Sequence, residues 1–320
     1  EWNFPEPLGR PYKTDENHIP SKEDCLSKDW ASYYTAFNTG TSFENIYKNG
    51  NGLRDSYGDY WGKLANEFKD VNGIVGFELM NEPWAGDIWR DPLLVYPGVA
   101  DKENLQPFYE ALAPKIYGND SDRIIFFESV TWTDEFNITI DDAGFTNVPG
   151  GTEYQDRSVF SFHYYSSPNF GSEDKYFWQR NHDGIRLNCT SMLTEFNICD
   201  LTDINAPSKT MDYVDKYLIS GWIGWEYKKF AGALPDGTCT GCGYGIFYKN
   251  GTINDITAKA VSRTYPMRVQ GNTLSITFNY TNGDFVLRYK VDTKITEPTI
   301  VYFNKKYWYI NGINYDIQPN

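Results

Sequence analysis

The stretch Gly73-Ile-Val-Gly-Phe-Glu-Leu-Met-Asn-Glu-Pro-Trp84 decides the fold of this chain. Ile74 to Met80 is a short apolar run, typical of a strand that is buried on both faces of a parallel sheet. The run ends at Asn81-Glu82-Pro83, because a proline cannot continue the hydrogen-bonded ladder. A carboxylate at the carboxyl end of such a strand occupies the position where α/β barrels place their catalytic groups. For Glu82 taken alone, a solvated loop residue is an equally good interpretation.

A second stretch, Ser191-Met-Leu-Thr-Glu-Phe-Asn197, favours the catalytic interpretation. It is again a short strand-like run with a glutamate, Glu195, close to its end. Because the carboxyl ends of parallel strands meet at one edge of a sheet, we expect Glu82 and Glu195 to face each other there. Two carboxylates in that arrangement suit acid/base and nucleophilic work on a glycosidic bond.

Strand-like and helix-like patterns alternate between residues 53 and 264, which predicts an α/β fold with a parallel sheet covered by helices. The pattern favours a barrel over an open doubly wound sheet, and the chain has no Gly-x-Gly-x-x-Gly motif of a dinucleotide-binding fold. Strands are expected at 74–80, 123–129, 158–162, 191–197 and 221–228, and helices at 53–68, 105–117, 172–182, 210–218 and 255–264.

These strands are too few to close a (β/α)8 TIM barrel, which needs three more. We therefore expect residues 1–264 to be the carboxyl-terminal part of a catalytic barrel, completed by an amino-terminal segment or a second chain. Residues 1–55 show no strand pattern and are expected to form an irregular loop segment. Residues 265–320 alternate apolar and polar positions around an Asn-Gly turn, with further strands at 269–280, 285–291, 299–303 and 307–310, which predicts a small antiparallel β-sandwich.

The composition limits the partners. The chain has 29 Lys+Arg against 43 Asp+Glu, a formal net charge of −14, which repels phosphate backbones, so nucleic acid is not an expected partner. No apolar run reaches the roughly 18 residues of a transmembrane helix. Aromatic residues are abundant (25 Tyr, 20 Phe and 10 Trp) and suit the faces of sugar rings, although cores and sheets also use them.

Sequons and cysteines indicate a secreted protein. Five N-glycosylation sequons begin at Asn119, Asn137, Asn188, Asn250 and Asn279. Cys189 and Cys199 are one candidate disulfide and Cys239 and Cys242 another, which leaves Cys25 with a partner outside this sequence. A lone Cys-x-x-Cys is poor evidence for zinc, and no metal or organic cofactor is expected.

The residues that carry a family resemblance are Asn81-Glu82-Pro83, His163-Tyr-Tyr165, Thr194-Glu195-Phe196 and Trp225. In these residues the chain resembles the retaining glycoside hydrolases of family five. Gly76-Phe-Glu-Leu-Met-Asn-Glu-Pro-Trp84 looks like the acid/base strand of the endoglycoceramidase branch. Gly221-Trp-Ile-Gly-Trp-Glu-Tyr-Lys228 looks like its last barrel strand, and an appended β-sandwich is also a feature of that branch.

By this resemblance Glu82 is the general acid/base and Glu195 is the nucleophile. Glu195 must be ionised to attack the anomeric carbon, and Glu82 must hold its proton until it protonates the leaving oxygen. The resemblance gives substrate-binding or supporting roles to Asn81, His163, Tyr165, Trp225, Lys228 and Trp132, with a weaker case for Glu226. For His163 a structural role and for Trp225 a core role are the alternatives. Glu78 is interpreted as a structural acid inside the barrel, and Glu128 fits either role.

The resemblance implies a secreted or lysosomal, N-glycosylated enzyme that cuts the β-link between the oligosaccharide and the ceramide of glycosphingolipids. A membrane surface or an activator protein is a candidate contact of this enzyme. A family-five endoglucanase or mannanase is an alternative, and a non-catalytic carbohydrate- or lipid-binding barrel is an alternative of another class. A groove for the lipid tails is expected along the loop after the acid/base strand, although that loop could instead cover the barrel. The residues concerned are Trp84, Ile88, Trp89, Leu93, Leu94 and Val95.

Overall fold

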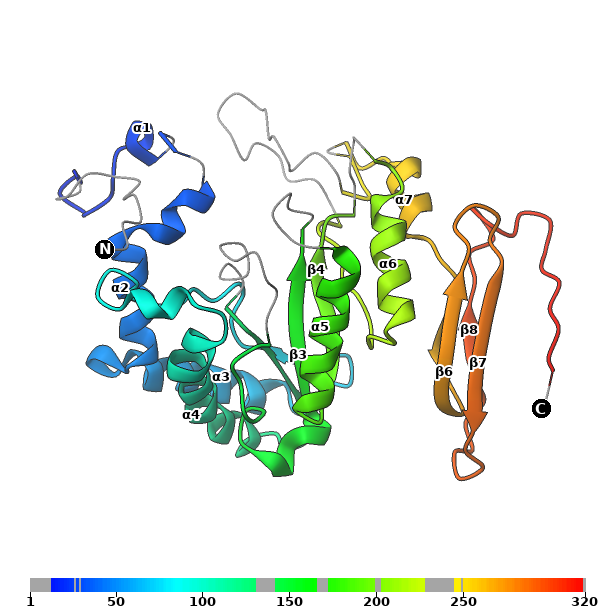
Figure 1. The fold of residues 1–320 in the computed structure, drawn as a ribbon, viewed down its shortest axis with the longest axis horizontal. Coiled ribbons are helices and arrows are strands. Elements are labelled where there is room, and N and C mark those ends of the chain that lie inside the picture. Colours follow the sequence, from blue (N-terminus) through cyan, green and yellow to red (C-terminus); the bar gives the residue numbers. More distant parts are fainter. Residues whose placement is uncertain are drawn as a thin grey trace. The chain divides into compact units, whose positions relative to one another are not determined.

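A computed structural model describes residues 13–25, 27–28, 30–130, 142–165, 172–198, 203–227, 245–248 and 250–318 (Figure 1). The chain divides into two compact units. The first comprises Glu1–Phe162 and Ser166–Ser191, and the second comprises His163–Tyr165 and Met192–Asn320.

A four-stranded sheet has the order β1-β2-β3-β4, which is also the order of the strands along the chain. The pairs β1–β2 and β2–β3 are parallel, as the βα alternation predicted. Its strands are β1 (Gly76–Glu78), β2 (Ile124–Glu128), β3 (Ser158–Tyr164) and β4 (Thr190–Phe196). The expected strand at 221–228 is present as two parallel bridges to β4, Leu193 to Trp222 and Asn197 to Trp225.

Helices of the first unit follow the predicted apolar spacing. α3 (Leu53–Phe68) packs on α4 (Gln106–Tyr117), and α5 (Glu173–Arg186) precedes β4. The α3–α4 approach is close, because a Cβ on Gly62 would lie 3.0 Å from the Lys115 carbonyl oxygen. A side chain at position 62 would therefore push the two helices apart.

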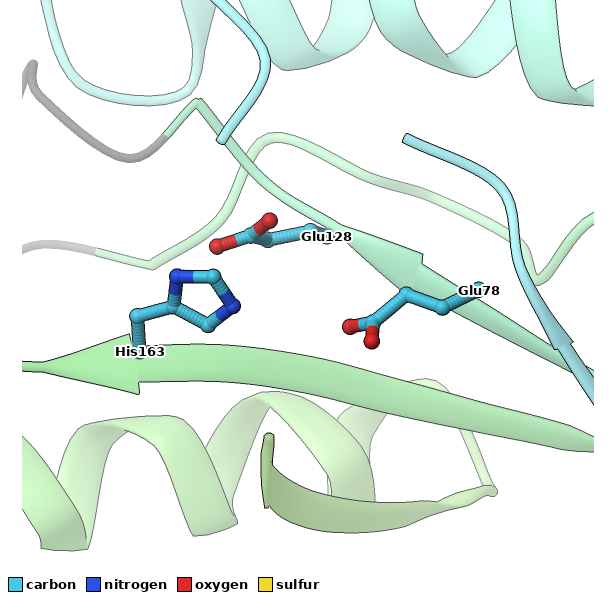
Figure 2. A group of neighbouring side chains, drawn as sticks. All are labelled: Glu78, Glu128 and His163. Carbon is cyan, nitrogen blue, oxygen red and sulfur yellow. The ribbon is translucent and has the colours of Figure 1, made fainter. Parts of the chain in front are cut away.

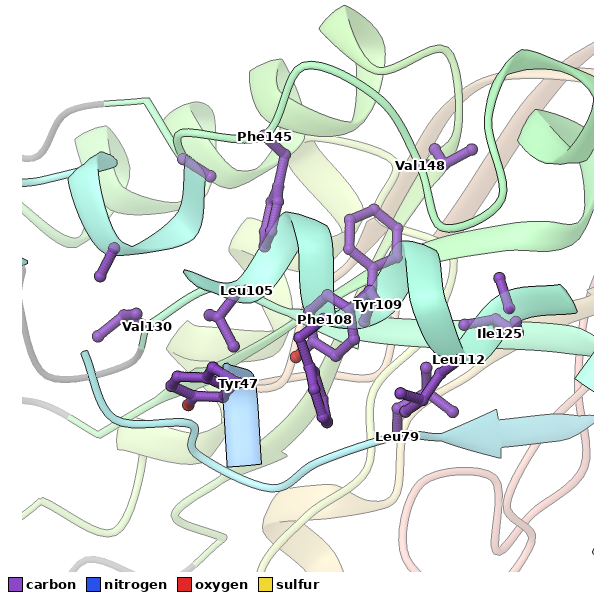
Figure 3. Packing of buried hydrophobic residues seen from close by; sticks show 14 of the residues in the cluster. Tyr47, Leu79, Leu105, Phe108, Tyr109, Leu112, Ile125, Val130, Phe145 and Val148 are labelled. Atoms are coloured by element: carbon purple, nitrogen blue, oxygen red, sulfur yellow. The ribbon is translucent and has the colours of Figure 1, made fainter. Parts of the chain in front are cut away.

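The core of the first unit lies between α4 and the sheet (Figure 3). Phe108 and Tyr109 of α4 are fully buried, and the Tyr109 ring lies 6.2 Å from that of Phe127 on β2. Burying a side chain of this size stabilises the fold by about 1.5–3 kcal/mol. This apolar layer supports the carboxyl end of β1 and β2, where the polar residues begin.

The segment 1–55, expected to be irregular, contains α2 (Phe37–Tyr47) and the short helix α1 (Lys22–Cys25). Gly40, Thr41 and Ser42 have low helix propensity, which hid α2 from the sequence pattern. Packing overrides that propensity: Tyr47 is 1% exposed, and its ring lies 5.4 Å from that of Phe108.

The second unit contains α6 (Ala206–Lys216) and α7 (Asp255–Val261), both predicted. After α7, the buried guanidinium of Arg263 pairs with Asp212 and Asp215 of α6 and lies over the ring of Phe278. This arginine therefore joins α6 to the strands that follow.

Those strands form two antiparallel pairs. β5 (Tyr265–Arg268) pairs with β8 (Ile300–Tyr302), and β6 (Gly271–Phe278) pairs with β7 (Phe285–Val291) across the Asn-Gly turn. The expected strand at 307–310 is wrong. The Asn304 side chain accepts the backbone N–H groups of Lys306 and Tyr307, so local hydrogen bonds hold a turn there in place of a ladder.

Candidate active site

Glu82 lies in the loop that follows β1 and is 7% exposed. This burial rules out the interpretation as a solvated loop residue. Its backbone has φ 43°, in the left-handed region that residues other than glycine rarely adopt. Its backbone N–H donates to Glu128 Oε2 at 2.8 Å. The neighbouring Asn81, expected to contact the sugar, is exposed.

We call residues 79–87 the acid loop. Side chains from several elements hold its backbone on either side of Glu82. The Tyr57 hydroxyl of α3 donates to the Leu79 carbonyl at 2.6 Å, and burial raises the pKa of Tyr57. The Tyr47 hydroxyl of α2 donates to the Trp84 carbonyl at 2.7 Å, and burial likewise raises the pKa of Tyr47 well above its usual value. Both hydroxyls therefore keep the protons that they donate.

The end of the acid loop is held by two further side chains. Asn104 Nδ2 donates to the Ala85 carbonyl at 2.7 Å and to Glu44 Oε2 at 3.1 Å. The same Glu44 oxygen accepts the Asp87 backbone N–H at 3.4 Å. The Leu79 N–H still bonds to the Phe126 carbonyl of β2 at 3.2 Å, and beyond Leu79 tertiary hydrogen bonds from side chains fix the loop that carries the predicted acid.

Glu195, the predicted nucleophile, lies inside β4 and its side chain is 19% exposed. The Tyr165 hydroxyl donates to Glu195 Oε1 at 2.5 Å. His163 Nδ1, on a side chain that is 2% exposed, lies 4.0 Å from Glu195 Oε2. A donated hydroxyl hydrogen bond fixes the direction of a carboxylate, so this arrangement suits a nucleophile oriented by Tyr165.

Trp225 is 51% exposed, which argues against the core role weighed for it. Its backbone N–H donates at 2.8 Å to the carbonyl of Phe196, the last residue of the strand that carries Glu195. The Trp225–Glu226 peptide is cis, and Glu226 is 8% exposed with Oε1 lacking a hydrogen-bond partner among the described residues. Lys228 and Trp132, the other predicted contacts, lie outside the described residues.

Acidic and histidine side chains gather along the sheet. Figure 2 shows three of these side chains, Glu78 of β1, Glu128 of β2 and His163 of β3. Carboxylate and imidazole groups are metal ligands, but Glu128 already accepts the Glu82 N–H and Glu195 accepts the Tyr165 hydroxyl. Two of these carboxylates therefore already accept hydrogen bonds from within the chain.

The predicted lipid groove is wrong for most of its residues. Trp84, Ile88, Leu94 and Val95 are all buried in the core, and Trp89 is partly buried with its indole N–H bonded to the Thr35 carbonyl at 2.9 Å. Only Leu93 of this set is exposed. The alternative, that the loop covers the barrel, describes these residues better. Apolar character alone does not separate a groove lining from a core.

Cys189, which was predicted to form a disulfide with Cys199, is a free thiol. Cys189 immediately precedes β4, whereas Cys199 follows it, and a strand advances about 3.3 Å per residue. Burial raises the pKa of the Cys189 thiol to about 11. Cys199, Cys239 and Cys242 lie outside the described residues.

Within the described ranges, no helix is both long enough and apolar enough to cross a membrane.

Comparison with known proteins identifies the family. Residues 27–231 match the cellulase family (glycosyl hydrolase family 5), and residues 263–320 match the glycoside hydrolase family 5 C-terminal domain. Over 99% of its length the chain is 41% identical to an endoglycoceramidase of Hydra vulgaris and 38% identical to one of Cyanea nozakii. It spans 59% and 62% of those two relatives.

Among solved structures, the chain resembles endo-glycoceramidase II from Rhodococcus sp. in a ganglioside GM3 complex, with a TM-score of 0.68 and 18% identity. The match covers 87% of this chain and 61% of that one and shows a shared fold. The family match over most of the chain and the parallel sheet agree with each other. The chain therefore belongs to glycosyl hydrolase family 5, whose fold is a (β/α)8 barrel followed here by a C-terminal domain.

Proposed function

We propose that the protein is a retaining, endo-acting glycoside hydrolase that cleaves the β-glycosidic bond between the oligosaccharide and the ceramide of glycosphingolipids. The relatives from Hydra vulgaris and Cyanea nozakii carry the name endoglycoceramidase, which supports this substrate class. The observation that carries the proposal is the Glu195 carboxylate of the second unit, which the Tyr165 hydroxyl orients through a hydrogen bond to Oε1 at 2.5 Å. Retaining enzymes hold their carboxyl groups about 5–5.5 Å apart, whereas inverting enzymes need about 6.5–9.5 Å to admit a water.

The two carboxyl groups perform a double displacement. Glu195, oriented by the Tyr165 hydroxyl, attacks the anomeric carbon while Glu82 donates its proton to the leaving oxygen. The oligosaccharide is then bound to Glu195 as an ester, and the Glu195 charge is neutralised. Glu82, now ionised, takes a proton from the incoming water, which releases the glycan with its original anomeric configuration.

Neighbouring side chains bind the sugar. The exposed Asn81 amide would bind the 2-hydroxyl of the sugar, an interaction that strengthens as the oxocarbenium character develops. Trp225 offers an exposed indole face as a platform for the ring. His163 supports Glu195, while Trp132 and Lys228 are proposed as further contacts on the basis of their sequence positions.

Hydrolysis of a ganglioside by the full-length protein tests this function. Wild type should release the intact oligosaccharide and ceramide, and Glu195→Gln should not. A soluble β-glucan or mannan should not be cleaved. Efficient hydrolysis of the polysaccharide would favour an endoglucanase or mannanase, and glycan binding without release would favour a non-catalytic barrel.

The proposed domain organisation is a carboxyl-terminal barrel part at 1–264 and a small β-sandwich at 265–320. β1 stands at one end of the strand order, and Val75, just before it, is 68% exposed. In the second unit, Ile223 lies between the two bridges to β4 and is 54% exposed. Three further parallel strands, from an amino-terminal segment or a second chain, would cover such edges. Mixing this chain with a separately prepared segment that carries those strands should raise its unfolding temperature if the two complete one barrel.

We further propose that the protein is N-glycosylated and secreted or lysosomal. Asn119, Asn188, Asn250 and Asn279 are all exposed, and Asn137 lies outside the described residues. Removal of N-glycans from protein made in a eukaryotic host should therefore lower its apparent mass. Because ceramide resides in bilayers, contact with a membrane surface or an activator protein belongs to the same proposal. Comparing hydrolysis in vesicles and in detergent tests that contact.

A further inference from the structure

Glu128 is a buried acid with no role in the double displacement described above. It is the last residue of β2 and is 2% exposed. Its backbone carbonyl accepts the Tyr109 hydroxyl at 2.9 Å, and its carboxylate Oε2 accepts the Glu82 backbone N–H at 2.8 Å. The side chain is therefore fixed at its base by the core and at its tip by the acid loop.

The Glu82 backbone needs support at this point. A φ of 43° places it in the left-handed region, which a residue with a Cβ adopts only when its surroundings enforce it. The other anchors of the acid loop act on Leu79 before Glu82 and on Trp84 to Asp87 after it. Glu128 acts on Glu82 itself, through a hydrogen bond in which the acceptor is a carboxylate and which is therefore stronger than a neutral one.

We propose that Glu128 is a positioning residue, which holds the Glu82 backbone in the left-handed conformation that aims the Glu82 carboxyl at the leaving oxygen. This inference rests on the proposed acid/base function of Glu82. Misplacing a catalytic group by roughly 1 Å can reduce the rate by about 10²-fold. Loss of the Glu128 acceptor should therefore impair proton donation more than it impairs attack by Glu195.

Leaving-group dependence distinguishes this role from a merely structural one. A ceramide alkoxide cannot depart without a proton, whereas a dinitrophenolate can. Measured as kcat/KM on the full-length protein, Glu128→Leu should lose about 10²-fold on a glycosphingolipid and less than about tenfold on the dinitrophenyl glycoside of the same glycan. Glu128→Gln keeps an acceptor oxygen and should retain most activity on both substrates.

Two variants keep the test decisive if Glu128→Leu does not fold. Glu128→Asp keeps the charge but withdraws the acceptor by one methylene, so it should show the same leaving-group dependence. Tyr109→Phe, the matched control, removes the hydrogen bond to the Glu128 backbone only, and should lower the unfolding temperature without any leaving-group dependence. Equal losses of Glu128→Leu or Glu128→Asp on the two substrates would overturn the proposal.

Glu82→Gln separates this inference from the proposed function. If Glu82→Gln shows strong leaving-group dependence and the Glu128 variants do not, the positioning role fails alone. If Glu82→Gln itself shows no such dependence, the acid/base assignment of Glu82 fails, and the positioning role fails with it.

Discussion

The acid loop and strand β4 place their glutamates by opposite means. Glu195 lies inside a regular strand, so the ladder of the sheet sets its backbone and one hydroxyl, that of Tyr165, orients its carboxylate. Glu82 lies beyond β1 in a left-handed conformation, held by tertiary hydrogen bonds from α2, α3 and β2. The difference teaches that a regular strand positions one carboxylate, whereas hydrogen bonds from several separate elements position the other. The predictions below test that contrast, from the largest expected effect to the smallest.

Glu195→Gln should abolish turnover, with a loss on the order of 10⁴-fold or more, because no other group can form the covalent intermediate. Ganglioside hydrolysis measures the loss, and thermal unfolding should remain close to wild type. Glu153→Gln, an exposed change outside the site, is the control and should retain full activity. Substantial turnover by Glu195→Gln would place the nucleophile elsewhere.

Tyr165→Phe tests the single side chain that orients Glu195. A hydrogen bond to a charged group contributes about 1.5–3 kcal/mol, so kcat should fall by roughly 10–10²-fold with KM little changed. Steady-state kinetics on a glycosphingolipid measures both constants. A KM effect without a kcat effect would instead make Tyr165 a substrate contact.

Tyr47→Phe removes a distant anchor of the acid loop. The Trp84 carbonyl would lose its buried donor, so the free energy of unfolding should fall by about 1–3 kcal/mol, as denaturant titration would show. The activity loss should be only a few-fold, because the bond from Glu128 to Glu82 remains. Tyr60→Phe, on the exposed face of α3, should change neither quantity. If Tyr47→Phe leaves both unchanged, packing and not hydrogen bonding holds the loop.

The smallest expected effect concerns the thiol of Cys189, the residue just before β4. A thiol pKa raised from 9.0 to about 11 means that labelling by a thiol reagent at pH 8 should be about 10²-fold slower than for an exposed cysteine. The raised folded-state pKa stabilises the fold fully below pH 9, and this contribution is lost as the pH rises towards 11. Cys189→Ser should flatten that alkaline loss and leave activity unchanged. Rapid labelling of the native protein at Cys189, mapped by mass spectrometry, would contradict the burial of this thiol.

Local pattern predicted most of the sheet and several helices. The apolar run that ends in Asn-Glu-Pro can be recognised as a strand from its own residues, without knowing which strand it pairs with. The same is true of the strand that carries Glu195. α2 was not visible, because its glycine and threonines disfavour a helix until Tyr47 packs into the core. The interpretation of Trp84 and Ile88 as a groove failed for a related reason, since burial depends on which elements lie above a loop.

The same limit applies to Glu128. Its position at the end of a strand marked it as either structural or functional, and nothing in the local sequence indicated that its carboxylate meets the Glu82 backbone. That contact joins residues 46 positions apart and follows from the pairing of β1 with β2. The residues near Glu128 in the sequence carry no pattern that predicts which distant strand it will pair with.

The left-handed backbone at position 82 has a consequence for evolution as well as for catalysis. Glycine adopts this conformation without steric penalty, so Glu82→Gly should relieve strain and raise the melting temperature while removing the acid. Selection for thermal stability therefore favours glycine at position 82, whereas selection for turnover favours glutamate. Glutamate should therefore persist at position 82 only as long as the catalytic activity is under selection.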